Sequence, residues 1–187
     1  MAINEPSAEQ RVHNRHIDVS TYAPEDNAIV VEGRLTDNRY RSTYYLSGDR
    51  RPPGIVHEMV IRMRVVGLDL TIEDIDVAMD TVPRDQCRQT LNSLRPVIGM
   101  QIKAGFTEAV KTKVGGPKGC THLVALLLAM APAAVQGAWA AMAQSPLVPG
   151  QYSDKALEIL EDTCWLWRSE GPLMQELREK LSRFDEE

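Results

Sequence analysis

Cysteine is scarce in this sequence, because only Cys87, Cys120 and Cys164 occur among its 187 residues. An odd and sparse set in a chain of this size excludes a disulfide framework and is typical of a reducing compartment. The N-terminal segment MAINEPSAEQR also lacks the apolar run of a secretory signal peptide. These two absences predict a cytoplasmic protein.

Clustered positive charge is missing as well. The net charge is -5 at pH 7, which disfavours a general nucleic-acid binder, and no basic amphipathic run suggests a membrane surface. From Gly119 to Ser153 there is no Asp, Glu, Lys or Arg. This apolar stretch is rich in alanine and interrupted by Pro132 and Gly137, so we expect a buried central helix rather than a membrane span.

Several catalytic motifs are absent. The chain has no C-x-x-C pair, no H-E-x-x-H and no G-x-G-x-x-G after a strand. The stretch GGPKGCT does not have the G-x-x-x-x-G-K-[ST] spacing of a phosphate-binding loop. A site must therefore be assembled from residues that lie far apart in the sequence.

The first half of the chain alternates apolar and polar residues with period two. With 43% hydrophobic and 25% charged residues, the composition is typical of one globular domain with its own core. The alternation predicts antiparallel strands with one buried face. We interpret residues 1–15 as an N-terminal arm and residues 16–187 as a single domain. The three clearest strand segments are residues 27–37, 55–67 and 70–80.

The second half has helical spacing instead. Strands followed by helices predict an α+β fold, in which an N-terminal antiparallel sheet of three or more strands precedes a C-terminal set of helices packed on one face. Glycine and proline positions set the expected helix boundaries. The expected helices cover residues 83–94, 104–114, 119–144 and 153–165, and a last one begins at residues 171–172.

The segment GGPKGCTHL, residues 115–123, carries the strongest chemical signal. It places Cys120 and His122 at the start of a long apolar helix, where unpaired N–H groups and the helix dipole favour a thiolate. Sulfur and imidazole are also ligands for zinc or iron. His57, on an otherwise apolar strand face, and Asp80, at a strand end, are the expected partners. We predict catalytic roles for all four, and metal ligation by His57, Cys120 and His122.

Three further residues are candidates for substrate binding. Arg34 or Lys118 would hold a substrate carboxylate, and Met59 would line an apolar pocket. Each site residue also has a structural alternative. Arg34 fits an ion pair across the solvent face of the sheet, a buried cysteine often does nothing but pack, and a histidine at a helix start can act as a cap. Cys87 and Cys164 are expected in the core.

The segments GIVHEM, DTVPRDQC, IGMQIKAGFTEAV and GCTHL resemble the bacterial domain-of-unknown-function family DUF2889 over roughly residues 13–164. Since genes of this family often stand among genes for acyl-CoA and aromatic-compound breakdown, the resemblance implies small-molecule catabolism. A weaker similarity is to NifU/IscU-like iron–sulfur scaffold domains. It implies ligands at His57, at Asp80 or Cys87, and at Cys120 with His122. The chain departs from that pattern, because His57 stands where the first scaffold cysteine belongs.

Three hypotheses for the function remain open. The first is an enzyme of lyase or hydrolase type that acts on a small, largely apolar or aromatic substrate, with or without zinc or iron. The second is a non-enzymatic metal or iron–sulfur carrier. The third is a structural module, in which the apolar helix over residues 123–142 forms a homodimer interface and Cys120 and His122 only pack.

Overall fold

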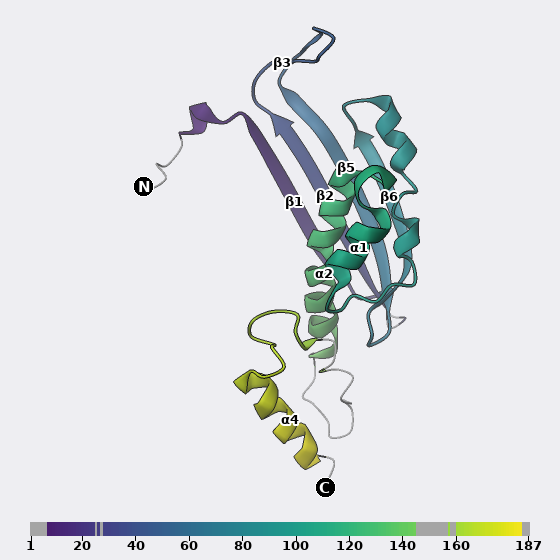
Figure 1. Cartoon of the computed structure of the whole chain (residues 1–187), viewed down its shortest axis with the longest axis vertical. Coiled ribbons are helices and arrows are strands. Elements are labelled where there is room, and N and C mark those ends of the chain that lie inside the picture. The colour runs from purple at the N-terminus through teal and green to yellow at the C-terminus, as the bar shows by residue number, and fades with distance from the viewer. Residues whose placement is uncertain (1–6, 25, 27, 145–156, 158–159, 185–187) are drawn as a thin grey trace.

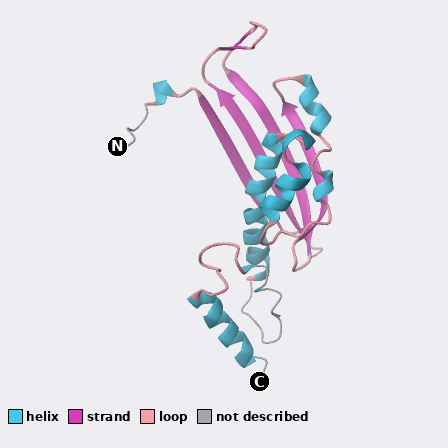
Figure 2. Ribbon diagram, in the orientation of Figure 1, coloured by secondary structure: helices cyan, strands magenta, loops and turns pink. Residues whose placement is uncertain are grey.

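The computed structural model describes residues 7–24, 26, 28–144, 157 and 160–184. An antiparallel sheet is followed by helices, as Figures 1 and 2 show, which confirms the predicted α+β class. The strands are β1 (His13–Tyr22), β2 (Ala28–Arg39), β3 (Thr43–Tyr44), β4 (Arg50–Arg51), β5 (Gly54–Val66) and β6 (Thr71–Thr81). The α-helices are α1 (Phe106–Val114), α2 (Thr121–Met142) and α4 (Pro172–Phe184), and short 3-10 helices are η1 (Ala8–Gln10), η2 (Asp85–Thr90), η3 (Arg95–Val97) and η4 (Gly116–Lys118).

The main sheet has the strand order β1-β2-β5-β6, with every neighbour antiparallel. Period-two alternation places one apolar set on the face that α2 and α1 cover (Figure 1). The opposite face carries the charged residues of the same strands. The predicted strand segments and their buried face are confirmed. The buried set from β2, β5 and β6 is Ile29, Val31, Leu35, Met59, Ile61, Met63, Val65, Ile72, Ile75 and Met79.

The edge strand β1 extends into the predicted arm. It begins at His13 and pairs with β2 along its whole length, from His13 opposite Arg39 to Tyr22 opposite Val30. Most of its side chains are exposed. Hydrophobic alternation is weak on such a strand, and for this reason residues 13–15 were not distinguishable from an arm by pattern.

The central helix α2 packs its leucine-rich face on the sheet. By length and composition it is the one helix, among the described residues, that is apolar enough to cross a membrane. Its residues Leu123, Leu126, Leu127 and Met130 are nevertheless fully buried against the sheet. The prediction of a buried central helix is therefore confirmed in this structure, and the helix runs through Pro132.

Two glycines let α2 lie close to the sheet. A Cβ atom added to Gly33 of β2 would lie 2.6 Å from the sulfur of Met130. A Cβ atom at Gly137 of α2 would collide with the side chain of Thr21 in β1. The Thr21 hydroxyl also donates a hydrogen bond to the Ala133 carbonyl at 3.2 Å. The helix is thus fixed against β1 and β2 along its length, and its N-terminus is fixed with it.

One helix prediction needs correction. Residues 83–94 form the 3-10 helix η2 and turns instead of an α-helix. The Thr90 side chain donates to the Cys87 carbonyl, a local bond that competes with helical backbone bonding. The Arg88 side chain donates to the Met79 carbonyl of β6. The predicted helix over residues 153–165 lies largely outside the described residues. Cys87 is half-buried and Cys164 is exposed, so the expectation that Cys164 belongs to the core is wrong.

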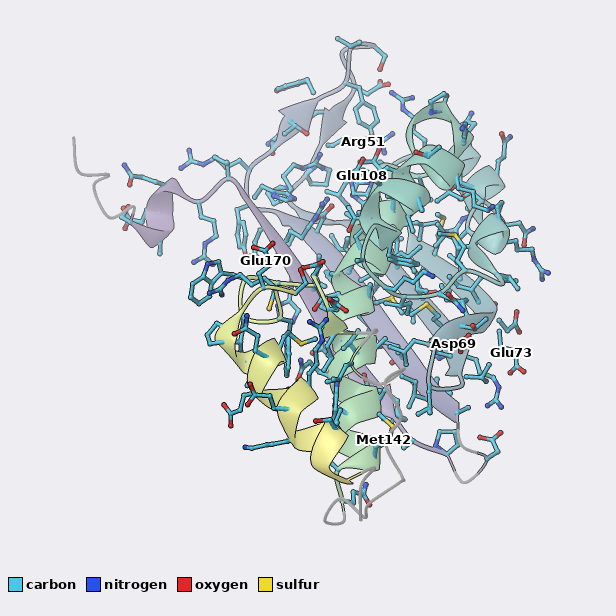
Figure 3. All side chains as sticks on the ribbon, turned by 60° about the horizontal axis from the view of Figure 1, so that its bottom comes forward. Arg51, Asp69, Glu73, Glu108, Met142 and Glu170 are labelled. Atoms are coloured by element: carbon cyan, nitrogen blue, oxygen red, sulfur yellow. The ribbon has the colours of Figure 1, made fainter. Side chains whose placement is uncertain are left out.

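The two ends of the sheet differ in character. Arg51 lies on the small β3–β4 hairpin and Asp69 in the β5–β6 turn, and Figure 3 shows them at opposite ends. The helix α2 begins at the hairpin end, because its start lies near the end of β2 and its later residues pack near Thr21. α4 lies beyond the opposite end of the sheet (Figure 1).

Replacing Gly33 with alanine should destabilise the protein by about 1–3 kcal/mol, the cost of overpacking a close helix–sheet contact. The Met130 side chain would have to move. Chemical denaturation measures the change in the free energy of unfolding. The neighbouring Arg34→Ala substitution on the exposed face is the control, and its effect should stay within about 0.5 kcal/mol. Equal stability of Gly33→Ala and wild type would contradict the close approach.

Candidate functional site

Polar side chains interrupt the helix-facing side of the sheet at the hairpin end. In the strand register, Arg15 of β1 lies opposite Asp37 of β2, and Asp37 lies opposite His57 of β5. Directly opposite residues share a face, so these three form one row across the sheet. The next row toward the core contains Leu35 and Met59, both buried. A charged row therefore borders the hydrophobic core.

β-Bulges flank His57 on both neighbouring strand pairs. The β2–β5 register shifts immediately after the Asp37–His57 pair. The β5–β6 register shifts between Glu58 and Met59, and Asp80 is the residue without a partner there. Bulges bend a strand and re-aim its side chains. Asp80 is exposed, and its carbonyl accepts a hydrogen bond from Arg88. The carboxylate that contacts His57 is that of Asp37. Asp80 is therefore not the predicted acidic partner of His57.

The Asp37 carboxylate is surrounded by cationic and imidazole groups. The side chain is buried, with 2% of the residue exposed. The Arg15 guanidinium donates two hydrogen bonds of 2.7 Å, one to each carboxylate oxygen. His57 Nδ1 lies 2.9 Å from Oδ2, and His13 Nε2 lies 3.3 Å from Oδ1. A buried carboxylate is costly unless it is paired and hydrogen-bonded, and these contacts satisfy it.

Cys120 and His122 approach this row from α2. Cys120 is the N-cap residue of the helix, and its sulfur lies 3.8 Å from His122 Nδ1. The other ring nitrogen, Nε2, lies 3.6 Å from Asp37 Oδ2. The imidazole rings of His122 and His57 stack, with their centroids 3.8 Å apart. The structure therefore brings together three of the four predicted catalytic residues.

The protonation states follow from these contacts. Burial raises the pKa of Asp37, but the Arg15 hydrogen bonds and charge outweigh it and leave the pKa below its usual range. Burial lowers the pKa of His57, and Asp37 offsets only part of this. His57 is thus neutral at pH 7 and donates from Nδ1 to Asp37, which leaves Nε2 with a free lone pair.

The Cys120 thiol is shifted toward the thiolate. Burial raises its pKa, but the hydrogen bond with His122 and the backbone N–H groups of Leu123 and His122 bring it below the usual range for cysteine. This is the effect expected for a thiol at a helix N-terminus beside an imidazole. Cys120 is half-buried, and the His122 side chain is 28% exposed, so a small molecule can reach both.

Asp37, His57 and His122 also form a candidate metal centre. One ligand atom from each residue lies within 4.8 Å of the others. Two imidazoles and a carboxylate suit zinc or non-haem iron. The Arg15 guanidinium weighs against a dication here, since it already occupies both oxygens of Asp37. Cys120 lies next to His122 but is outside this group of three.

The predicted substrate-binding residues lie elsewhere. Arg34 is exposed on the opposite face of the sheet and pairs with Glu32 at 3.1 Å. The Lys118 ammonium donates to the Thr112 carbonyl at 2.6 Å. Met59 is buried in the core beside the polar row. Arg34 and Lys118 thus have other polar partners, and Met59 belongs to the hydrophobic cluster against which Cys120 packs.

Sequence reasoning missed Asp37, Arg15 and His13. Asp37 carried a usable signal, because it lies two residues after Leu35 and therefore on the buried face of β2. His57 lies in the same way two residues before Met59 on the buried face of β5. A charged residue at a buried-face position rarely stays unpaired. Arg15 and His13 carried none, since they lie in the segment interpreted as an arm.

Comparison with known proteins gives one family. The family model described as "Protein of unknown function (DUF2889)" matches residues 13–136. The matched segment begins at the first residue of β1 and contains every residue of the site, and it ends within α2. No curated protein and no solved structure matches the chain. The similarity to iron–sulfur scaffold domains therefore stays a prediction from sequence.

Replacing Asp37 with alanine should lower the free energy of unfolding by about 1.5–3 kcal/mol at pH 7, the range for hydrogen bonds to charged groups. Because the folded protein depresses the pKa of Asp37, its stabilisation is present above the pKa of the unfolded state. It is lost as the pH falls through the lower folded-state pKa, so the difference between wild type and variant should begin to shrink near about pH 4 and disappear only below the folded-state pKa.

Asp80→Ala is the matched control for this measurement, because it removes the same group from an exposed position. Its effect should stay within about 0.5 kcal/mol at every pH. Urea denaturation of the three proteins between acid and neutral pH gives the comparison. A constant difference between Asp37→Ala and wild type across this range would contradict the assigned ionisation.

Proposed function

The chain belongs to the DUF2889 family, and we propose that it is a thiol-dependent enzyme of hydrolase type that acts on a small molecule. Cys120 is the nucleophile, His122 the general base and acid, and Asp37 the group that orients His122. The proposal rests on one observation: the Cys120 sulfur at the N-terminus of α2 lies 3.8 Å from an imidazole whose other nitrogen faces a buried carboxylate.

The spacing suits nucleophilic catalysis. A cysteine nucleophile needs a base within reach and a third group that fixes the tautomer of that base. The negative charge of Asp37 favours a proton on Nε2 of His122, 3.6 Å away. Nδ1 then presents its lone pair to the thiol. The 3.8 Å contact is a long hydrogen bond to sulfur, and the 3.6 Å distance between nitrogen and oxygen is longer than a hydrogen bond. Such contacts commonly shorten when a substrate binds.

The reaction that these groups support is acyl transfer to water. Nδ1 of His122 takes the thiol proton, and the Cys120 sulfur attacks the carbonyl carbon of an ester or thioester. The new C–S bond forms while the bond to the leaving group breaks, and His122 returns its proton to that leaving group. Water, deprotonated by His122, then hydrolyses the acyl-enzyme and releases the acid and the free thiol.

Arg15 and His57 complete the electrostatics. The hydrogen bond to Asp37 raises the pKa of Arg15 despite the opposing effect of burial, and the charge of Cys120 adds to this rise. The His57 ring stacks on His122 and limits its rotation. Its free Nε2 is a second acceptor at the same place. Arg15 would stabilise the negative charge of the Cys120 thiolate before the sulfur attacks the carbonyl carbon.

A mononuclear metal centre is the second candidate. The compact Asp37, His57 and His122 group favours it. A metal there would take the ring nitrogen that His122 directs toward Asp37, and Cys120 would be a further ligand rather than a nucleophile. The metal carrier and metalloenzyme hypotheses both predict this occupancy. The thiol mechanism needs none.

Iodoacetamide should alkylate Cys120 at least tenfold faster than Cys164 at pH 7, because the thiolate fraction at Cys120 is larger. Cys164 is the internal control, because it is exposed. Peptide mapping by mass spectrometry gives both rates. In His122→Ala the Cys120 rate should fall by about tenfold while that of Cys164 stays constant.

Cys120 alkylation no faster than that of Cys164 would overturn the nucleophile assignment. A fast rate unaffected by His122→Ala would remove His122 from the pair and leave the helix N-terminus as the cause. Asp80→Ala serves as the matched variant again, and neither rate should change in it.

Elemental analysis of untagged protein, purified without chelator, separates the two candidates. The thiol mechanism predicts well below one zinc or iron per chain, and alkylation kinetics unchanged by a chelator. About one metal per chain, lost in His57→Ala and in His122→Ala but retained in Asp80→Ala, would favour the metal centre instead. In that case chelation should release Cys120 for alkylation.

A further inference from the structure

A pocket opens at the hairpin end of the sheet, near the Asp37–His57 row. It has a volume of about 210 Å³. Two arginines and a tyrosine provide its polar wall, and proline and aliphatic side chains provide the rest. The principal lining residues are Arg39, Tyr45, Arg51, Pro53, Val56 and Val82. Arg39 lies two residues beyond Asp37 in β2, and Val56 directly precedes His57 in β5. The pocket and the row therefore lie at the same end of the sheet.

The arginines of this pocket have no acidic partner among the described residues. On the outer face, by contrast, Arg62 pairs with Glu32, and Arg64 pairs with Asp26 and Glu73. Arg39 donates only to the Pro52 carbonyl, at 2.9 Å, and its Nε atom is buried without a hydrogen-bond partner. A buried donor of this kind is costly unless a ligand or water satisfies it.

Tyr45 fixes the arrangement. Its hydroxyl donates to the Pro83 carbonyl at 3.0 Å, which anchors the small hairpin to the end of β6. Arg51 lies over its ring at 4.5 Å from the centroid, and Arg84 at 4.8 Å. Two guanidinium groups on one ring repel each other, and an anion between or beside them removes that repulsion. The prolines in the wall limit backbone movement, and stacking on the Tyr45 ring positions the Arg51 guanidinium.

We propose that this pocket binds an organic oxyanion, with a carboxylate or phosphate group on Arg39 and Arg51 and an apolar body against Pro53, Val56 and Val82. Planar guanidinium groups bind both oxyanions in a bidentate manner. Pockets for complete drug-sized ligands usually measure about 300–1,000 Å³, so this one holds a single group of a larger molecule. That this molecule is the substrate of Cys120 rests on the proposed function.

Binding of small aromatic probes tests the site directly. Benzoate and phenyl phosphate present the two oxyanions on the same apolar body, and benzyl alcohol is the neutral control. Isothermal titration should show binding of one or both anions and none of the alcohol. The tighter anion identifies the chemical class. Arg51→Gln should weaken that binding at least tenfold. Because Arg51 is exposed, the variant should fold normally.

Arg50→Gln is the matched control, since it removes the same charge from the adjacent exposed residue, which bonds to Ser42 and does not line the pocket. Binding should change less than twofold in it. No binding of either anion, or equal weakening in Arg50→Gln and Arg51→Gln, would overturn the site.

The same titration on Cys120→Ser separates this inference from the proposed function. Wild-type affinity in Cys120→Ser, together with an unreactive Cys120 in the native protein, would retain the anion site and reject the thiol mechanism. A reactive Cys120 without anion binding would do the reverse. If the molecule held here is the substrate, the bound anion should slow alkylation of Cys120, but not of Cys164, and Arg51→Gln should abolish this protection.

Discussion

Asp37 carries a buried carboxylate charge at the border of the hydrophobic core, and the other groups of the site are arranged around it. Arg15 neutralises it with two hydrogen bonds, His57 donates to it, and His122 turns one nitrogen toward it. Each of these groups comes from a different strand or helix. One buried charge therefore fixes the relative positions of β1, β2, β5 and the start of α2.

The close packing of α2 on the sheet gives Cys120 its position. Gly33 and Gly137 remove the side chains that would keep helix and strands apart, and the leucine face of α2 fills the core. As a result, the N-terminus of α2 lies beside the row of Arg15, Asp37 and His57. The partial positive charge of that terminus adds to Arg15, so the thiol lies where two sources of positive potential meet. The packing of α2 and the environment of the Cys120 thiol thus both depend on the close approach of the helix to the sheet at Gly33 and Gly137.

Much of this could be predicted from the sequence, and the reasons for the rest are physical. Period-two patterns in β2, β5 and β6 are strong because each strand has one face in the core. The helix N-terminus at Cys120 was evident from the glycines before it. Asp80 was chosen as the carboxylate because strand ends were expected to align, but a bulge leaves it unpaired. The partners of Arg15 and Asp37 depend on cross-strand register, which the pattern of a single exposed edge strand does not determine.

Because β1 is an edge strand, the free energy of opening its part of the site differs from the free energy of global unfolding. One side of this strand pairs with β2, and its side chains are mostly exposed. Such segments open at a lower free energy than the strands of a core, as a local unfolding event. Thr21 anchors one end of β1 to α2, whereas Arg15 and His13 attach the other end to Asp37. When these residues leave, Asp37 loses its counter-charge while β2, β5 and α2 stay folded. The electrostatics of the site are therefore coupled to local opening of that strand end as well as to global unfolding.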